Sequence, residues 1–344
     1  MNNYETGLLE AAAAHLRARG LTVTIKEPRR DEHSDAWLRV AKGKQHIDYA
    51  VDVQRQVTPQ TLGAIVSQLN HRAALTKKPM LLVTNYITPP VADRLANLEQ
   101  QFVDTAGNAF LDAPGVFVFI TGRRPAKNAV AQRPDRAFTP AGLKTLFAFI
   151  CNPQLVTATY REIAAAANIA LGALPTVMTG IQQAGHLHVM GNKRQLVATR
   201  RLLDEWSLAY ARTLRPKQLL RTLVSPAFEA WREWDLQADG ARWGGEPAAA
   251  LLTGNLKPGV LTLYADKLPA RLMVQHRMMT ARPNDDHNLV EVRRPFWGEV
   301  SSVRADVVPL PLVYADLLAT GDARCLEVAE IIYEEYLARL FTST

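Results

Sequence analysis

Residues 160–189 read YREIAAAANIALGALPTVMTGIQQAGHLHV, and this stretch decides the fold of the middle of the chain. Thr159 and Glu162 have the spacing of a capping box, which predicts a short helix directly after the threonine. Apolar residues then recur at helical spacing over residues 172–184, and Gly185 is placed as a left-handed C-cap. The stretch therefore predicts two short helices joined by a tight turn.

The flanking sequence adds a helix before this pair and a hairpin after it. Thr139-Pro140 combines an N-cap residue with proline at the first helical position, and Asn152-Pro153 stops the helix. Residues 186–190 and 193–197 are short extended runs around the turn signal Gly191-Asn192. The whole pattern resembles the bacterial winged helix and so implies DNA binding. Two alternatives are a winged helix used for protein contacts and a helical pair with a hairpin that merely packs.

The predicted third helix presents small, neutral residues outward once its apolar stripe is turned inward. These residues are the candidates for contact with base edges: Ala173, Thr176, Thr179, Gln182 and Gln183. Pro175 lacks an N–H, which is harmless only in the first turn, so the helix is expected to start near Gly172. Lys193 and Arg194 at the tip of the wing are candidates for phosphate contact, and Arg161 on the second helix completes the set.

Positive charge is concentrated in the same part of a chain of 344 residues whose net charge is +7. Residues 1–125 have 15 basic and 12 acidic side chains, residues 126–223 have 13 and 4, and residues 224–344 have 12 and 17. The net charges of the three segments are therefore +3, +9 and −5. Attraction to a phosphate backbone explains this asymmetry, whereas solvation alone does not require it.

The composition bounds the class of protein. With 48% hydrophobic residues, the chain is expected to be globular, with two or three domains. Its two cysteines, the lack of an apolar run near ~20 residues and the start of the chain predict a cytoplasmic protein without membrane contact. No cofactor and no metal are expected: His186 and His188 alternate on one strand but lack a third ligand, and we expect both to be exposed.

Residues 1–125 predict an α/β domain. The expected helices cover residues 4–19, 58–76 and 89–98, and the expected strands cover residues 21–25, 36–40, 47–53, 80–84, 102–104 and 116–120. The order of the first eight of these elements, α-β-β-β-α-β-α-β, resembles the restriction-endonuclease-like fold.

Nucleases of that fold place an acid on the second strand and Glu-x-Lys or Asp-x-Lys on the third. The two carboxylates hold Mg²⁺ while the lysine assists the attacking water. Here Asp35 is the candidate for the first acid, and Asp52 and Gln54 occupy the second motif. Gln54 stands where lysine belongs and cannot supply its charge. The domain is therefore interpreted as a scaffold without chemistry, and a metal-dependent DNA nuclease is the alternative.

Residues 126–137 form a basic linker rich in proline and arginine, between the first domain and a winged helix over residues 138–212. Arg123, Arg124 and Lys127 lie at its start. These cations either lie along DNA phosphates or are simply solvated. Basic arms often contact phosphates, but most charge runs are only exposed to solvent.

Residues 213–344 predict a third, α/β domain. Trp243-Gly-Gly-Glu246 opens a helix as the Gly-rich turn of nucleotidyltransferases does, with the helix N-terminus facing phosphates. The strand over residues 260–264 is followed by only one acid, Asp266, where two are needed for Mg²⁺. A degenerate nucleotidyltransferase-like domain, used for packing or partner binding, is therefore expected. Its remaining expected elements are a helix or strand at 267–273, extended runs at 290–292 and 307–312, and helices at 314–318 and 323–340.

Several motifs together resemble the AbiEi-type antitoxins of type IV toxin–antitoxin systems. They are Asp104-Thr-Ala-Gly-Asn108-Ala, Phe138-Thr-Pro-Ala-Gly-Leu-Lys144, the winged helix, Trp243-Gly-Gly-Glu246, Arg294-Pro-Phe-Trp297 and the run from Val308 to Asp322. The resemblance implies a DNA-binding transcriptional regulator that represses its own operon and is paired with a nucleotidyltransferase-like toxin that it need not touch. A homodimer is expected if the DNA site is palindromic. The chain departs from the family in carrying its winged helix in the middle.

Overall fold

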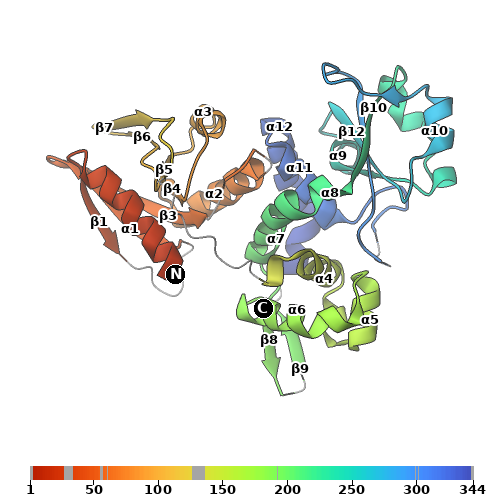
Figure 1. Ribbon diagram of the computed structural model, residues 1–344, viewed down its shortest axis with the longest axis horizontal. Coiled ribbons are helices and arrows are strands. Elements are labelled where there is room, and N and C mark those ends of the chain that lie inside the picture. The colour runs from red at the N-terminus through yellow and green to blue at the C-terminus, as the bar shows by residue number, and fades with distance from the viewer. Residues whose placement is uncertain are drawn as a thin grey trace. The chain divides into compact units, whose positions relative to one another are not determined.

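The computed structural model describes residues 3–26, 34–54, 57–59, 61–125, 136–191, 193–298, 300 and 302–341. The chain divides into two compact units, Met1–Gln132 and Arg133–Thr344. The first unit contains one sheet with three helices, and the second contains a helical part followed by a smaller sheet with its own helices (Figure 1).

The first unit is built on a seven-stranded sheet in the order β1-β2-β3-β4-β5-β6-β7. Its strands are β1 (Thr22–Lys26), β2 (Ala36–Lys42), β3 (Gln45–Gln54), β4 (Met80–Thr84), β5 (Phe102–Asp104), β6 (Ala109–Ala113) and β7 (Val116–Ile120). Its helices are α1 (Asn3–Arg17), α2 (Leu62–Thr76) and α3 (Pro89–Asn97). Strands β3, β4 and β5 run parallel, and the remaining neighbours pair antiparallel.

Helices α1 and α2 lie on opposite faces of this sheet. Val51 and Val53 of β3 pack with the apolar side of α1 in one buried cluster. Asp52 lies between them in a strand whose side chains alternate, so it points to the other face. There it meets Arg72 of α2. A polar group therefore lies under α2 although the strand is buried on both sides.

The elements of the first unit follow the predicted order, with one omission. Strand β6 was not predicted, because Gly107, Asn108, Pro114 and Gly115 flank it closely and suggest a continuous loop. In the structure β6 pairs with β5 and β7 and carries the sheet on toward its edge. The assignment of the unit to the restriction-endonuclease-like fold stays a prediction.

The second unit begins with residues 136–213, which we call the three-helix part after α4, α5 and α6, the three α-helices that precede its hairpin. Its elements are η1 (Arg136–Phe138), α4 (Pro140–Cys151), η2 (Pro153–Thr157), α5 (Tyr160–Ala166), η3 (Leu171–Ala173), α6 (Leu174–Gln183), β8 (Leu187–Met190), β9 (Lys193–Leu196) and α7 (Arg200–Thr213). Thr159 caps α5 in a complete capping box with Glu162. The hairpin β8–β9 follows α6 and is separate from the larger sheets (Figure 1).

The rest of the second unit, which we call the C-terminal part, surrounds a five-stranded sheet in the order β11-β12-β14-β10-β13. Its strands are β10 (Leu219–Val224), β11 (Arg242–Gly244), β12 (Val260–Tyr264), β13 (Met279–Thr280) and β14 (Leu289–Arg293). Its helices are α8 (Arg215–Gln218), η4 (Phe228–Glu233), η5 (Gln237–Asp239), α9 (Gly245–Thr253), α10 (Ala270–Gln275), α11 (Leu310–Thr320), α12 (Ala323–Ile332), the π-helix η6 (Tyr333–Leu337) and α13 (Ala338–Phe341). Among the neighbouring strands of this five-stranded sheet, only β12 and β14 pair in parallel.

Two expectations for the C-terminal part were wrong in detail. The run over residues 307–312 is not a strand: Val307 makes a single bridge to Trp243, and α11 starts at Leu310 with Pro311 in its first turn. The helix expected over residues 323–340 is interrupted by the π-helical turn η6. The segment at 267–273 resolves into a helix, α10, which begins three residues later than expected.

Within the described residues, no single helix is long and apolar enough to span a membrane. One bent pair, Tyr160–Ala166 with Leu171–Gln183, meets the criteria of length and composition when its two helices are counted together.

Candidate nucleic-acid interface

Helix α6 separates its apolar and polar residues between two faces as the sequence predicts. Its buried side is formed by Leu174, Val177, Met178 and Ile181. Its exposed side includes Thr176, Thr179, Gln182 and Gln183, while Ala173 is half-buried at its start. The Thr179 hydroxyl donates to the Pro175 carbonyl oxygen at 3.0 Å, so its donor is already used within the helix. The face offers short, neutral groups.

Helices α5 and α6 form a tight angular pair. Their axes are bent by 110° across a short connection, within the range of helix-turn-helix pairs. The turn η1 packs against both α4 and α6 because each has a glycine at the contact: a Cβ on Gly142 would lie 2.2 Å from the Ala137 carbonyl oxygen, and one on Gly180 would lie 2.7 Å from the Arg136 Cβ. These close approaches hold α6 with its polar side outward.

The two cations at the hairpin differ in their surroundings. Lys193 is exposed beside Gly191, whose φ of +59° suits the tight turn. Arg194 is turned back onto the protein: its guanidinium donates to the Ala158 carbonyl oxygen at 2.6 Å and lies 5.2 Å from the centre of the Tyr160 ring. The expectation that both side chains project from the tip is therefore correct only for Lys193. Arg194 braces the hairpin against the start of α5.

The other cations expected at DNA lie in different parts of the chain. Arg161 is exposed on α5, in the second unit. Arg123 and Arg124 are exposed after β7, in the first unit. Lys127 lies outside the described residues. Arg161 and Lys193 thus belong to the same unit as α6, whereas Arg123 and Arg124 belong to the first unit.

His186 was expected to be exposed, and this was wrong. It lies directly before β8, it is buried, and its Nε2 is 2.7 Å from Glu205 Oε2 of α7. Arg201 donates to the other oxygen of Glu205 at 2.7 Å. Burial raises the pKa of Glu205, but His186 and Arg201 lower it further, so the net shift is downward. This pair joins the root of the hairpin to α7, while His188 is exposed as expected.

The three residues expected of a nuclease do converge, in what we call the acid centre. Asp52 is fully buried and accepts a hydrogen bond from the Gln54 side chain at 2.7 Å. Asp35 accepts from the Val53 backbone N–H at 2.8 Å and is about one quarter exposed, so it is not an ordinary solvated carboxylate.

A cation from another helix lies between the two carboxylates of the acid centre. The Arg72 guanidinium donates to Asp52 and is 3.6 Å from Asp35. Its single positive charge lies where a nuclease would place Mg²⁺. Within the described residues, no group of three or more His, Cys, Asp or Glu side chains is arranged to hold a metal. The carboxylates of the acid centre are therefore held by hydrogen bonds and by an ion pair with Arg72.

The Gly-rich turn of the C-terminal part is filled by protein. A Cβ on Gly244 would lie 2.5 Å from the Tyr264 ring, and Gly245 has a φ of +47° beside Thr262. Glu246 is buried and accepts from the Gly259 backbone N–H at 2.7 Å. The start of α9 thus packs on β12 and its neighbours. The one acid expected nearby, Asp266, is exposed after β12.

A buried polar network joins the three-helix part to the C-terminal part. Asp316 of α11 accepts hydrogen bonds from Tyr210 of α7 at 3.0 Å, Tyr264 of β12 at 2.8 Å and Arg215 at 3.0 Å. Burial and the Asp316 carboxylate raise the pKa of both tyrosines, so they remain donors. Every polar group of the network has a partner, as buried groups require. The network fixes α7 to the C-terminal part.

Aromatic packing strengthens the same connection. Phe147 of α4 lies 5.0 Å from the Phe296 ring and 5.8 Å from the Trp297 ring, centre to centre. The next residue, Gly298, donates its N–H to the Ala166 carbonyl oxygen at 3.0 Å, and a Cβ there would lie 2.5 Å from the Ala165 carbonyl oxygen. The segment after β14 therefore packs directly against the end of α5. A rigid mount of this kind keeps α6 in one orientation.

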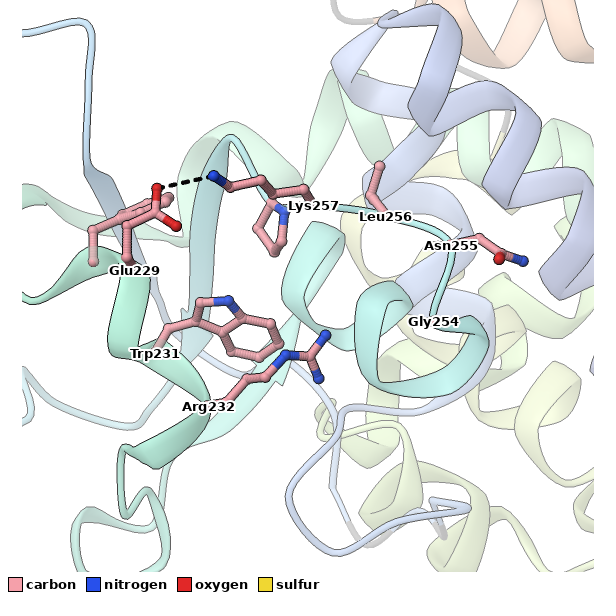
Figure 2. A pocket seen from close by; sticks show the side chains of 9 residues that line it. Glu229, Trp231, Arg232, Gly254, Asn255, Leu256 and Lys257 are labelled. Atoms are coloured by element: carbon pink, nitrogen blue, oxygen red, sulfur yellow. Dashed lines mark ion pairs between the residues drawn. The ribbon is translucent and has the colours of Figure 1, made fainter.

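A pocket of about 440 Å³ opens in the C-terminal part, between η4 and the loop after α9. Figure 2 shows Trp231 and Arg232 on one side and the loop from Gly254 to Lys257 on the other. The Arg232 guanidinium lies 4.6 Å from the centre of the Trp231 ring, and Lys257 is 3.2 Å from Glu229. Both cations of the pocket are therefore engaged by the protein.

In the second unit, a bent helix pair is followed by a hairpin, and the pair is packed against an α/β part. Residues 195–338 match the family model of the transcriptional regulator, AbiEi antitoxin, of type IV TA systems. The matched segment is less than half of the chain and covers α7 and the C-terminal part, but neither α6 nor the first unit. No curated protein and no solved structure matches the chain.

Proposed function

We propose that the chain is a DNA-binding transcriptional regulator, an AbiEi-like antitoxin that represses its own operon. The observation that carries the proposal is the exposed polar face of α6 beside an exposed lysine on the hairpin. The three-helix part then acts as a winged helix, with α6 in the major groove and Lys193 and Arg161 on phosphates. The family match to α7 and the C-terminal part supports the same conclusion.

The other parts take supporting roles in this proposal. The first unit is a restriction-endonuclease-like scaffold in which Arg72 pairs with the acids. The C-terminal part is a degenerate nucleotidyltransferase-like domain whose Gly-rich turn serves packing. Duplex DNA is the main partner, and a homodimer forms if the operator is palindromic. If the operon also encodes a nucleotidyltransferase-like toxin, the proposal requires no direct contact with it.

A binding assay on the DNA upstream of the chain's own gene tests this proposal. The full chain is titrated with that fragment and with an unrelated duplex of equal length, over a series of KCl concentrations. We expect binding to both at low salt, tighter binding to the upstream fragment, and a steep loss of affinity with salt. Equal affinity for both fragments at every salt concentration would contradict operon repression.

The nuclease alternative is separated by a cleavage assay. Supercoiled plasmid is incubated with the chain and Mg²⁺ or Mn²⁺, with Asp52→Asn as the control variant. We expect no cleavage, because the Arg72 guanidinium lies between the two carboxylates, where the metal ion would have to bind. Cleavage that is lost in the variant would overturn the regulator as the main function.

A further inference from the structure

Three side chains that can carry positive charge meet at the turn between β5 and β6 in the first unit. A Cβ built on Gly107 would lie 3.1 Å from His15 Nδ1 and 3.2 Å from a guanidinium nitrogen of Arg123. Arg19 donates to the Gly107 carbonyl oxygen at 3.1 Å. We call His15, Arg19 and Arg123 the cation cluster. The φ of Gly107 is +88°, and any side chain here would displace the imidazole or the guanidinium.

The cation cluster has no acidic counterpart among the described residues. Its members make no ion pair with Asp or Glu, and the Arg123 guanidinium has no acceptor there. Burial, and then the nearby charge of Arg123, lower the pKa of Arg19. Like charges held close together repel, and an anion between them would remove that cost. The positive charge of the cluster is therefore not balanced by an acidic side chain among the described residues.

Arg123 is held there by a buried scaffold rather than being part of a loose arm. The Asn108 carboxamide accepts from the Arg123 backbone N–H at 2.8 Å and donates to its carbonyl oxygen at 3.0 Å. Asn108 in turn donates to Asp104 at 2.7 Å, and both residues are fully buried. Asp104 also accepts from the backbone N–H groups of residues 87, 106 and 108, so its charge is already satisfied.

His15 and Arg19 present remaining donors to the same space. His15 Nε2 is 2.9 Å from the Thr105 carbonyl oxygen, which can only accept, so Nε2 carries a proton. Nδ1 is the nitrogen beside Gly107, and in the cationic imidazolium it becomes a donor as well. Arg19 uses donors on the His15 and Gly107 carbonyl oxygens, and a guanidinium has five N–H groups in all.

We propose that the cation cluster binds a phosphate group of duplex DNA, so that the first unit makes a DNA contact of its own. Guanidinium groups match phosphate oxygens bidentately, and phosphate contacts fix position without reading sequence. The inference rests on the proposed function, because it takes DNA as the ligand. It assigns the first unit a part in binding, although its acid centre lacks the means for cleavage.

The salt dependence of duplex binding tests the cation cluster in the full chain. Arg123→Gln removes one cation from an exposed side chain. Arg39→Gln is the matched control, because it makes the same charge change in the same unit, but Arg39 is already bound by Asp48 at 2.6 and 2.9 Å. We expect Arg123→Gln to reduce the log–log salt slope by roughly one and Arg39→Gln to leave it unchanged.

Three outcomes count against the inference. Duplex binding with the same salt slope in wild type and Arg123→Gln overturns it while leaving the proposed function intact. No duplex binding by the wild type removes both proposals.

The third outcome concerns the source of the phosphate. The ring resonances of His15, assigned with His15→Gln, are followed during addition of inorganic phosphate and of duplex. Shifts with duplex at low concentration support the site. Shifts with inorganic phosphate alone show a site for a small anion and overturn its assignment to DNA.

Discussion

The acid centre of the first unit and the outer face of α6 both place polar side chains on a regular element, but they satisfy them differently. Asp52 is fully buried and is matched by Arg72 and Gln54. Thr176 and Gln182 are exposed on α6, where an outside partner can reach them. The acid centre has the residue types of a catalytic site, but its charged groups already have partners. The outer face of α6 has ordinary residues whose polar groups are exposed.

This difference shows that residue types alone do not locate function. Two acids close together suggest metal chemistry, but a guanidinium from a helix can supply positive charge at the same place, and the acids then form a structural ion pair. A neutral helix face suggests little, yet its exposure and its rigid mounting suit a DNA groove. The experiments below test whether the two regions differ in this way.

The largest effect is expected in the acid centre. Asp52→Asn leaves Arg72 with the more distant carboxylate of Asp35 alone, and removing one partner of a buried pair costs about 3 kcal/mol of unfolding free energy. Urea unfolding measures the loss, and hydrogen exchange in β3 assigns it to the first unit. Asp48→Asn on the same strand breaks a more exposed pair with Arg39, for which we expect at most about 1 kcal/mol. Equal losses in the two variants would mean that the acid centre is not a structural pair.

A smaller effect is expected where the hairpin joins α7. Glu205→Gln removes the charged acceptor of His186 and Arg201, and we expect about 1.5 kcal/mol of lost stability at pH 7. Because the pKa of Glu205 is lowered in the folded state, the stabilisation is complete above the ordinary glutamate pKa of ~4.3 and is lost as the pH falls through the folded value.

Unfolding of wild type and Glu205→Gln from pH 7 to pH 3 checks both parts of that expectation. The two free energies should converge as the pH falls. Glu229→Gln, in an exposed pair with Lys257, serves as the control and should leave the pH profile unchanged. A constant difference between wild type and Glu205→Gln at all pH values would exclude the titration of Glu205 as the cause.

The two hairpin cations should separate charge from positioning. Lys193→Gln removes an exposed cation, so we expect the log–log salt slope of duplex binding to fall by roughly one. Arg194→Gln removes the brace to Ala158 and Tyr160 instead, so the affinity should fall while the slope stays constant. Fluorescence titrations at four salt concentrations measure both. A loss of slope in Arg194→Gln would place its guanidinium on the DNA.

The sequence predicted those features that depend on local periodicity. Helical spacing separates the buried Val177 and Ile181 from the exposed Thr176, and a capping box marks the start of α5. The order of elements in the first unit also followed from alternation and turn signals, except for β6. These features are encoded within a few neighbouring residues.

The sequence did not predict contacts between distant residues. Arg72 meets Asp52 only because α2 crosses β3 on the face opposite α1, and nothing near Asp52 in the sequence marks this partner. The direction of Arg194 depends on a carbonyl group 36 residues earlier. His15 and Arg123 are brought together by the fold around Gly107. Side-chain partners of this kind require the tertiary structure.

The smallest effect concerns sequence preference at α6. Thr176 lies in the first turn after Pro175, on the exposed side, and it can offer one methyl group and one hydrogen bond to a base edge. Gln182 and Gln183 can bind a base bidentately, but they lie late in the helix, away from the end that enters the groove in this class of motif. We therefore expect modest preference over a mainly electrostatic affinity, with Thr176→Ala relaxing one base pair by about 1 kcal/mol. Selection of binding sites from random duplexes, repeated with the variant, measures this directly. A long, sharply defined motif that Thr176→Ala leaves unchanged would show that the sequence is read elsewhere, by the arginine-rich linker or by the first unit.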